Sequence, residues 1–188
     1  MANKQPAVTE QTKANLKAAF WSLYQEKSLS EISVKQITDR AGYNRGTFYL
    51  YYRDIYDLCE QVETEVLEVI AHLIEQISGL EGPQRLESTI SSLAGMAQTY
   101  KPYMKVLLGD RGNPSFKTRF KELAWPFMRQ NAIGERTFAP REERILKESY
   151  LAALIASITA WLDEEDPLPI EEFIAFVMST LFDARAEA

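Results

Sequence analysis

Residues 33–58 hold the feature that most constrains this 188-residue chain, two short helical patterns joined by a tight turn. Ser33 and Asn44 stand where N-caps are expected, one before each pattern. Between the patterns, Gly42 supplies the conformational freedom that the turn requires. The segment therefore predicts a helix-turn-helix, a motif whose second helix enters the major groove of DNA.

The rest of the chain also has helical periodicity, and it contains no strand pattern or internal repeat. From Asp54 to Gly79, apolar residues recur at spacings of three and four over about six turns. Other helices are expected at 9–26, with Thr9 as N-cap, and at 86–100, 103–108, 116–131, 141–162 and 170–184. Pro102 should break one of them, and Pro126 should kink or break another. We expect an all-α protein of about eight or nine helices, with a three-helix helix-turn-helix domain at 1–53 and a helical bundle at 54–188.

The net charge of -6 is unevenly distributed along the chain. Up to Arg53 there are eight basic and four acidic residues, a net +4, so the remainder has 13 basic and 23 acidic residues, a net -10. A basic N-terminal part on an otherwise acidic chain suits a protein in which only the N-terminal part contacts phosphate.

Composition argues against a membrane protein and against an enzyme. No stretch reaches the ~20 uninterrupted apolar residues of a membrane span, so we expect a cytoplasmic protein. The single cysteine, Cys59, excludes an internal disulfide, and His72 is the only histidine. Thirteen residues along one helix would place these two side chains about 20 Å apart, and neither has a partner in a metal-ligand pattern. We therefore expect no enzyme activity, metal or cofactor.

The run Asn44-Arg45-Gly46-Thr47-Phe48-Tyr49, followed by Tyr51-Tyr52 and Asp57-Leu58, resembles the DNA-binding domain of the TetR family of bacterial transcriptional regulators. The resemblance covers about residues 9–58. More loosely, 100–109, Phe116 and Trp161 resemble a TetR subgroup common in low-GC Gram-positive bacteria.

The second helix of the motif carries side chains suited to DNA. Arg45 can bind phosphate or guanine, Thr47 can contact a thymine methyl group, and Gly46 lets the helix approach the groove. By resemblance, Tyr49 donates its hydroxyl to a phosphate, and Tyr51 either does the same or packs in the core. The expected DNA contacts are Ser33, Lys35, Asn44, Arg45, Gly46, Thr47, Tyr49, Tyr51 and Arg53.

The chain departs from the family at Ile55, where a phosphate-binding lysine is usual. Arg53 is the nearest cation that could compensate. We expect DNA binding to be weaker and less dependent on salt than in the family, because each lost phosphate contact lowers the salt slope by about one.

The resemblance also implies that the C-terminal helices form a dimer and enclose a small-molecule pocket. Two apolar stripes near the C-terminus predict a four-helix interface, although they could instead face their own core: Leu151, Leu154, Ile155, Ile158, Trp161, Phe173, Phe176, Val177 and Leu181. Aromatic and thioether side chains around the two expected helix breaks suggest an apolar pocket, although most of them are more simply explained as core: Tyr100, Tyr103, Met104, Trp125, Met128 and Tyr150.

The resemblance implies a repressor that holds a palindromic DNA operator as a homodimer and is released by a small apolar or aromatic effector. The departure at Ile55 leaves an alternative open, a co-regulator or protein-interaction module with weak DNA binding. A gel shift at low salt distinguishes the two.

Overall fold

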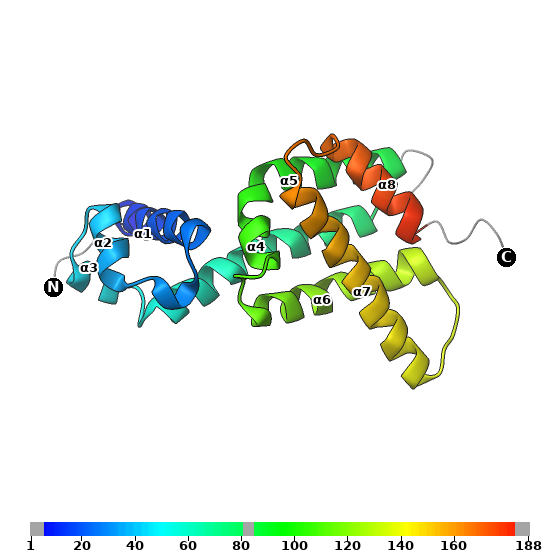
Figure 1. Ribbon diagram of the computed structural model, residues 1–188, viewed down its shortest axis with the longest axis horizontal. Helices are drawn as coiled ribbons and strands as arrows, with labels where there is room; N and C mark the ends of the chain where they lie inside the picture. Colours follow the sequence, from blue (N-terminus) through cyan, green and yellow to red (C-terminus); the bar gives the residue numbers. More distant parts are fainter. Residues whose placement is uncertain (1–5, 81–84, 183–188) are drawn as a thin grey trace.

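The computed structural model describes residues 6–80 and 85–182, and over these residues it has eight α-helices and no strand. The prediction of an all-α fold is therefore confirmed. Figure 1 shows α1–α3 at one end of an elongated molecule and α5–α8 at the other, with α4 running between them. The elements are α1(Pro6–Glu26), η1(Leu29–Glu31), α2(Val34–Ala41), α3(Arg45–Tyr49), α4(Ile55–Ser78), α5(Arg85–Leu108), α6(Pro114–Met128), η2(Arg129–Ile133), α7(Pro140–Asp163) and α8(Ile170–Phe182).

We call α1–α3 the head. Its core is closed by one apolar face from each helix, together with the start of α4. Phe48 is fully buried and Tyr52 nearly so, as predicted, and their rings lie 5.4 Å apart. On the surface, the Arg40 guanidinium ties α2 to α1 by bonding Glu26 at 2.9 Å and Ser22 at 2.7 Å. The short α3 is thus held by the packing of its neighbours, since five residues are too few to form a stable helix alone.

The predicted caps of the helix-turn-helix are confirmed. Ser33 and Gln36 form a reciprocal capping box at the start of α2, and Asn44 caps α3. Gly42 ends α2 with φ at 74°, in the left-handed region that L residues with a Cβ rarely occupy. Asp54 caps α4 by accepting a bond from the Asp57 N–H. Each boundary of the motif is therefore encoded locally.

The start of the first helix and the break at Pro102 were predicted incorrectly. The first helix begins at Pro6, which suits its first turn, so Thr9 lies inside the helix instead of capping it. Helix α5 continues through Pro102, and it includes the piece expected as a separate helix at 103–108. Met104, Leu107 and Leu108 are buried beyond the proline, and their packing offsets the ~3 kcal/mol that proline costs inside a helix.

Helix α6 likewise continues through Pro126 and ends two residues later, where the π-helical turn η2 begins. Arg129 then holds the following loop by donating to the carbonyls of Gly134 and Arg136. The predicted helices over 141–162 and 170–184 correspond to α7 and α8, although residues 183–184 lie outside the described residues. Gly82 and Pro83, expected to stop the fourth helix, also lie outside them.

We call α4–α8 and the loops between them the body. Five residues of the predicted apolar stripe of α4 are buried, Leu58, Val62, Val66, Leu73 and Ile77, whereas Val69 of the same stripe is half-buried. Leu58 belongs to the head core, whereas Leu73 and Ile77 lie among body helices. Because α4 has 24 residues, it extends about 36 Å and is a component of both cores.

Helix α7 is unusual because it is apolar yet largely uncovered. Its 24 residues include an 18-residue window with mean hydropathy 1.3, of which only 11% is buried, so by length and composition alone it could cross a membrane. The same properties occur in helices of proteins that do not enter membranes. In this protomer most of the large apolar side chains of α7 are buried or half-buried, and the face that stays exposed carries mainly small residues.

Candidate functional site

The recognition helix α3 is held at its N-terminus by Asn44. Asn44 Oδ1 accepts a hydrogen bond from the Thr47 N–H at 2.9 Å and another from Thr47 Oγ1 at 3.3 Å. A Cβ at position 46 would come within 3.1 Å of that same oxygen, so glycine there leaves the cap undisturbed. Asn44 is therefore a cap first, and its Nδ2 amide is the group that remains suitable for DNA.

Other predicted contacts on the head differ in how available they are. Arg45 is exposed, and Tyr49 is 57% exposed with its ring edge-on to Phe48. Thr47 is half-buried, and its hydroxyl already donates to Asn44. Arg45 and Tyr49 are thus the side chains on α3 with most freedom to reach an external partner.

The predicted contacts at the start of α2 have partners within the head. The Ser33 hydroxyl lies 3.1 Å from Gln36 Oε1 within the capping box. Lys35 is exposed and pairs with Asp39 at 2.7 Å, a surface ion pair that phosphate could replace at little cost. Lys35 is therefore the better of the two for an electrostatic contact.

Beyond α3, the chain turns sharply toward α4. Tyr51 is half-buried, with its ring 6.5 Å from that of Tyr52, and Arg53 is exposed with Nε 3.6 Å from Asp54 Oδ2. Ile55 is half-buried and packs against the head core. Apolar packing, which a lysine ammonium could not supply, therefore replaces the cation usual at this position.

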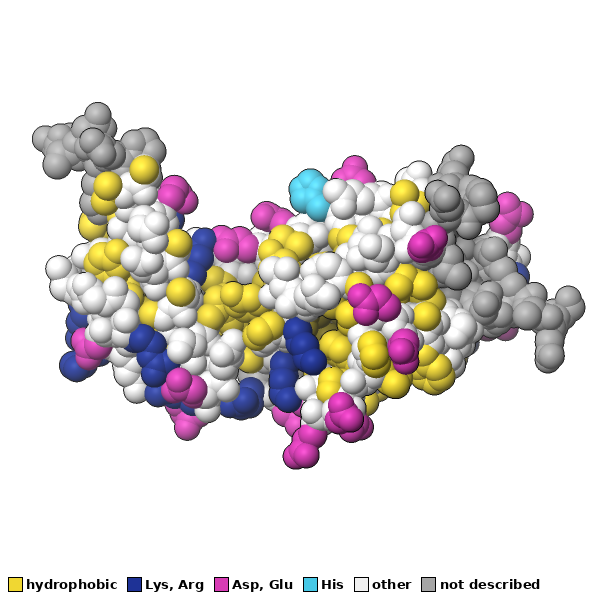
Figure 2. Space-filling view, turned by 90° about the horizontal axis from the view of Figure 1, so that it is seen from above, with side chains coloured by type: hydrophobic (Ala, Val, Ile, Leu, Met, Phe, Trp, Pro, Cys, Tyr) yellow, Lys and Arg dark blue, Asp and Glu magenta, His cyan; other side chains and the backbone are white. Residues whose placement is uncertain are grey.

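Two exposed residues beside the predicted contacts were not anticipated from the sequence. Leu50 and Tyr56 are both 64% exposed, directly after α3 and at the second residue of α4. Helical periodicity could have found Tyr56, since it lies off the apolar stripe of α4. Figure 2 shows Lys and Arg side chains along one side of the head, interspersed with Asp and Glu, and mainly Asp and Glu side chains at the far end of the body.

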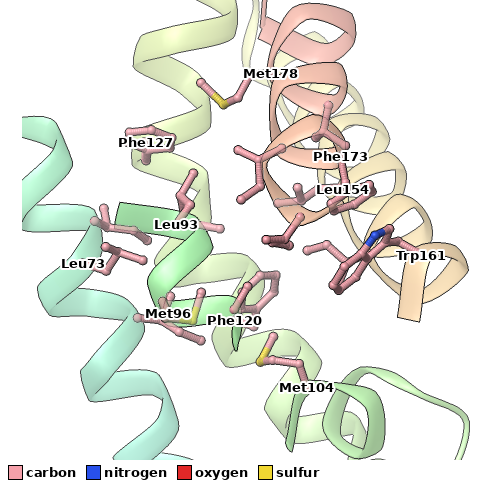
Figure 3. A pocket seen from close by; sticks show the side chains of 18 of the residues that line it. Leu73, Leu93, Met96, Met104, Phe120, Phe127, Leu154, Trp161, Phe173 and Met178 are labelled. Carbon is pink, nitrogen blue, oxygen red and sulfur yellow. The ribbon is translucent and has the colours of Figure 1, made fainter. Parts of the chain in front are cut away.

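The body contains an apolar cavity of about 180 Å³. Side chains from α4 to α8 converge on it, and Figure 3 shows Leu73, Met104, Phe120, Trp161 and Met178 around the space. Every lining side chain among the described residues is apolar except Lys101. Its occupant would be held mainly by dispersion and by exclusion of water.

Lys101 and Trp161 both line this cavity. Lys101 Nζ lies 4.1 Å from the centroid of the Trp161 ring, a cation–π contact. The indole is fixed on both sides, because Nε1 donates to the Leu168 carbonyl at 2.8 Å and the ring stacks on Phe173 at 5.1 Å. This part of the cavity wall is therefore rigid.

The six residues predicted for the pocket are divided by the structure. Met104 and Met128 line the cavity. Tyr100 and Tyr103 instead line a groove between α1, α4 and α5, where the Tyr103 ring packs edge-on at 4.5 Å against Trp21 of the head. Trp125 and Tyr150 pack against the core but line neither space.

The nine residues predicted for a dimer interface lie mostly on the inner faces of α7 and α8. Leu151 and Val177 are buried in the protomer, and a larger group lines the cavity: Leu154, Ile158, Trp161, Phe173 and Val177. Ile155 and Leu181 are half-buried, and Phe176 is 60% exposed. The open face of α7 instead carries small residues that the apolar stripe did not single out: Ser149, Ala152, Ala156 and Ala160.

A buried polar cluster lies where the head meets the body. The Glu63 side chain is 1% exposed, and its carboxylate accepts bonds from Cys59 Sγ and Asn113 Nδ2, each at 3.4 Å. Arg119 lies 3.9 Å from it, and the nearby Tyr24 hydroxyl of α1 donates to the Arg111 carbonyl at 3.4 Å. Burial raises the pKa of Glu63 above its usual 4.5, against the opposing effect of the hydrogen bonds from Cys59 and Asn113 and of Arg119. Burial also raises the pKa of the Cys59 thiol, which makes it a poor nucleophile.

Two family models match this chain. The model described as the C-terminal region of transcriptional regulators matches residues 84–183, more than half of the chain. The model described as bacterial regulatory proteins of the tetR family matches residues 16–62, which include the whole helix-turn-helix. A curated relative, the uncharacterized HTH-type transcriptional regulator YxbF of Bacillus subtilis (strain 168), is 32% identical over 59 residues. The match covers 31% of this chain and only 16% of that relative's length.

Solved structures share the fold over nearly the whole chain. A TetR transcriptional regulator from Streptococcus agalactiae 2603V superposes with a TM-score of 0.69 and 23% identity, over 94% of this chain and 96% of that one. NalD, the secondary repressor of the MexAB-OprM multidrug efflux pump in Pseudomonas aeruginosa, superposes with a TM-score of 0.64 and 21% identity, over 93% of this chain and 96% of that one. At these identities the likeness establishes the fold.

Proposed function

Because this chain belongs to the TetR family of bacterial transcriptional regulators, whose members are not enzymes, we propose that it is a repressor that holds a palindromic operator as a homodimer. A small molecule in the body cavity would release it, and the protein would act in the cytoplasm. The observation that carries the proposal is the pairing of an exposed, capped recognition helix with a separate apolar cavity, connected by α4.

The head supports the DNA-binding half of the proposal. Arg45 and Tyr49 are exposed on α3, and Lys35 and Arg53 are exposed beside it. In this proposal Arg45 binds guanine or phosphate, Tyr49 donates to a phosphate, and Ser33, Asn44, Gly46, Thr47 and Tyr51 fit the helix to the groove. The boundary between the head, residues 1–53, and the body, residues 54–188, is part of the same proposal.

The body supports the second half of the proposal, that an effector releases the protein from DNA. Ile70, Leu73, Ile74 and Ile77 of α4 line the cavity, whereas Leu58 of the same helix is buried in the head core. A second connection runs through α5, where Met104 lines the cavity and the adjacent Tyr103 packs on Trp21 of α1. An effector would shift the spacing of the two recognition helices only to the extent that it binds the two conformations with different affinity.

Homodimer formation is supported by the uncovered apolar helix α7 and by the exposed Phe176 of α8. Two copies of each helix would form a four-helix interface, with the small residues of α7 allowing close approach. The two-fold axis would then set two recognition helices on successive major grooves of a near-palindrome. NalD, similar in fold, is described as a repressor, which agrees with this role.

The test is a gel shift with DNA from upstream of the protein's own coding region, at low and high salt. We expect a specific band at low salt, and Arg45→Ala should weaken it about tenfold or more, because a charge-assisted bond to DNA contributes about 1.5–3 kcal/mol. Tyr49→Phe should weaken it less, since it removes one neutral donor. Both variants should keep the wild-type circular dichroism spectrum.

Arg141→Ala, which removes an exposed arginine from α7, is the matched control and should bind as wild type. The absence of a specific band at low salt would reject the repressor and favour the co-regulator with weak DNA binding. That alternative has the half-buried Ile55 in its favour, because no phosphate anchor exists there.

A further inference from the structure

We infer that the body cavity takes a small carboxylic acid with an apolar tail, whose carboxylate pairs with Lys101 while the tail fills the space behind Trp161. The inference rests on the proposed function, because it names the chemical class of the effector that the cavity would hold. It is carried by Lys101, the one charged residue among the described residues that line the cavity: its stem forms part of the apolar wall, and its ammonium lies 4.1 Å from the centroid of the Trp161 ring.

The size of the cavity sets the size of the tail. Its volume is about 180 Å³. An engineered cavity of about 150 Å³ lined by Leu, Ile and Phe takes up benzene, so this one suits a ring or chain of about six to ten carbon atoms. The lining includes four methionines, Met96, Met104, Met128 and Met178, whose flexible side chains adapt to different shapes.

Lys101 differs in its surroundings from three of the other four lysines of the body. Lys105, Lys121 and Lys147 each pair with a carboxylate within 3.1 Å. Among the described residues, no carboxylate lies within 4.0 Å of Lys101 Nζ, and the Trp161 ring is its charge-stabilising neighbour. Lys101 therefore has its ammonium available for an anion, although the body as a whole carries a net charge of -10.

The arrangement favours an anionic group over a neutral or cationic one. The four-carbon stem of Lys101 lines the cavity, and rotation about its terminal bonds moves the ammonium without disturbing the wall. A carboxylate beside Lys101 would gain a charge-assisted hydrogen bond next to an apolar, poorly hydrated surface, where such bonds are strongest. An alcohol would gain a neutral bond, and an amine would be repelled.

Three compounds with the same eight-carbon tail test this preference: octanoate, octanol and octylamine. Isothermal titration calorimetry on the purified full-length protein should give octanoate about tenfold to hundredfold tighter binding than octanol, the range expected for one charge-assisted bond. Octylamine should bind most weakly. In the gel shift, octanoate should release the DNA at concentrations where octanol does not.

Lys101→Met keeps an apolar stem of similar length and removes the charge. In this variant octanoate and octanol should bind equally, whereas the matched control Lys117→Met, which removes a lysine of α6 that does not line the cavity, should keep the wild-type preference. Ala124→Leu adds volume inside the cavity and should weaken octanoate and octanol together.

The inference is overturned if wild type binds octanol as tightly as octanoate, if it binds neither, or if Lys101→Met retains the preference. Equal binding of the two compounds, sensitive to Ala124→Leu, would leave the cavity as the effector site with a different ligand class. Failure of the proposed function would be seen separately, in the gel shift. A protein that gives no specific band is not a repressor, whichever of these compounds it binds.

Discussion

Single side chains in the head serve local structure before they serve recognition. Ser33 and Asn44 use their side-chain oxygens to satisfy N–H groups at the starts of α2 and α3. The first N–H groups of a helix have no hydrogen-bond partner within that helix, so a side-chain cap stabilises each helix by about 1 kcal/mol. The polar residues that look most like DNA readers are thus partly committed to holding the short helices that present Arg45 and Tyr49.

Two substitutions of Asn44 separate the cap from DNA contact. Asn44→Ala removes the acceptor for the Thr47 N–H and should lower the free energy of unfolding by about 1 kcal/mol, measured by urea denaturation. Asn44→Asp keeps an equally good cap and should leave stability within about 0.5 kcal/mol of wild type, while its charge repels phosphate and lowers operator affinity in fluorescence anisotropy. Wild-type stability of Asn44→Ala would show that the cap does not support α3.

Whole helices respond to their neighbours as well as to their own residues. Pro102 and Pro126 each lack the N–H that an α-helix uses, yet α5 and α6 continue past them. Local rules predicted a break at Pro102 and a kink or break at Pro126, because they weigh only the lost hydrogen bond and the clash with the preceding turn. Buried side chains on both sides of each proline, including Met104 and Met128, hold these helices together.

Helix α4 carries a charge that its surroundings disfavour. Glu63 lies in the buried cluster between α1, α4 and α6, and its pKa is raised, so the folded protein retains this proton at a higher pH than the unfolded chain does. Stability from this group is therefore present at pH values below about 4.5 and is lost as the pH rises through the folded-state pKa.

Glu63→Gln should remove that pH dependence. The free energy of unfolding of wild type should fall between pH 4.5 and neutral pH relative to that of the variant, because only wild type must ionise a buried carboxyl. Urea denaturation at a series of pH values measures the difference, with Glu68→Gln, exposed on the same helix, as control. Parallel profiles for Glu63→Gln and wild type would contradict the assignment.

The complete protomer separates two tasks in space. The head presents basic and aromatic groups at one end, the body encloses the cavity at the other, and α4, Tyr103 and Trp21 connect them. One protomer leaves the small-residue face of α7 uncovered, although an 18-residue stretch of that helix is apolar enough to cross a membrane by composition alone. An uncovered face of this kind is what a second copy would bury.

Ala156→Glu tests whether a second copy of the chain buries this face of α7. Ala156 is exposed on α7, and a carboxylate there would be buried without a partner between two copies, so we expect a monomer by sedimentation equilibrium and loss of operator binding. Gln98→Glu places the same charge on an exposed site of α5 and should leave both properties unchanged. A dimer with wild-type affinity in Ala156→Glu would exclude this face.

From the sequence alone, the helix-turn-helix, its caps, the all-α class and the TetR family were predictable, because each depends on residues close together in the chain. Gly42 requires its turn, and Asn44 caps α3 three residues from its partner. The tertiary structure decided where the apolar stripes face. Leu154 and Trp161 line the cavity, and Tyr103 packs against the head, because side chains distant in sequence must fill the same space. Periodicity identifies the apolar face of a helix, and only packing shows whether that face meets a core, a cavity or a second copy.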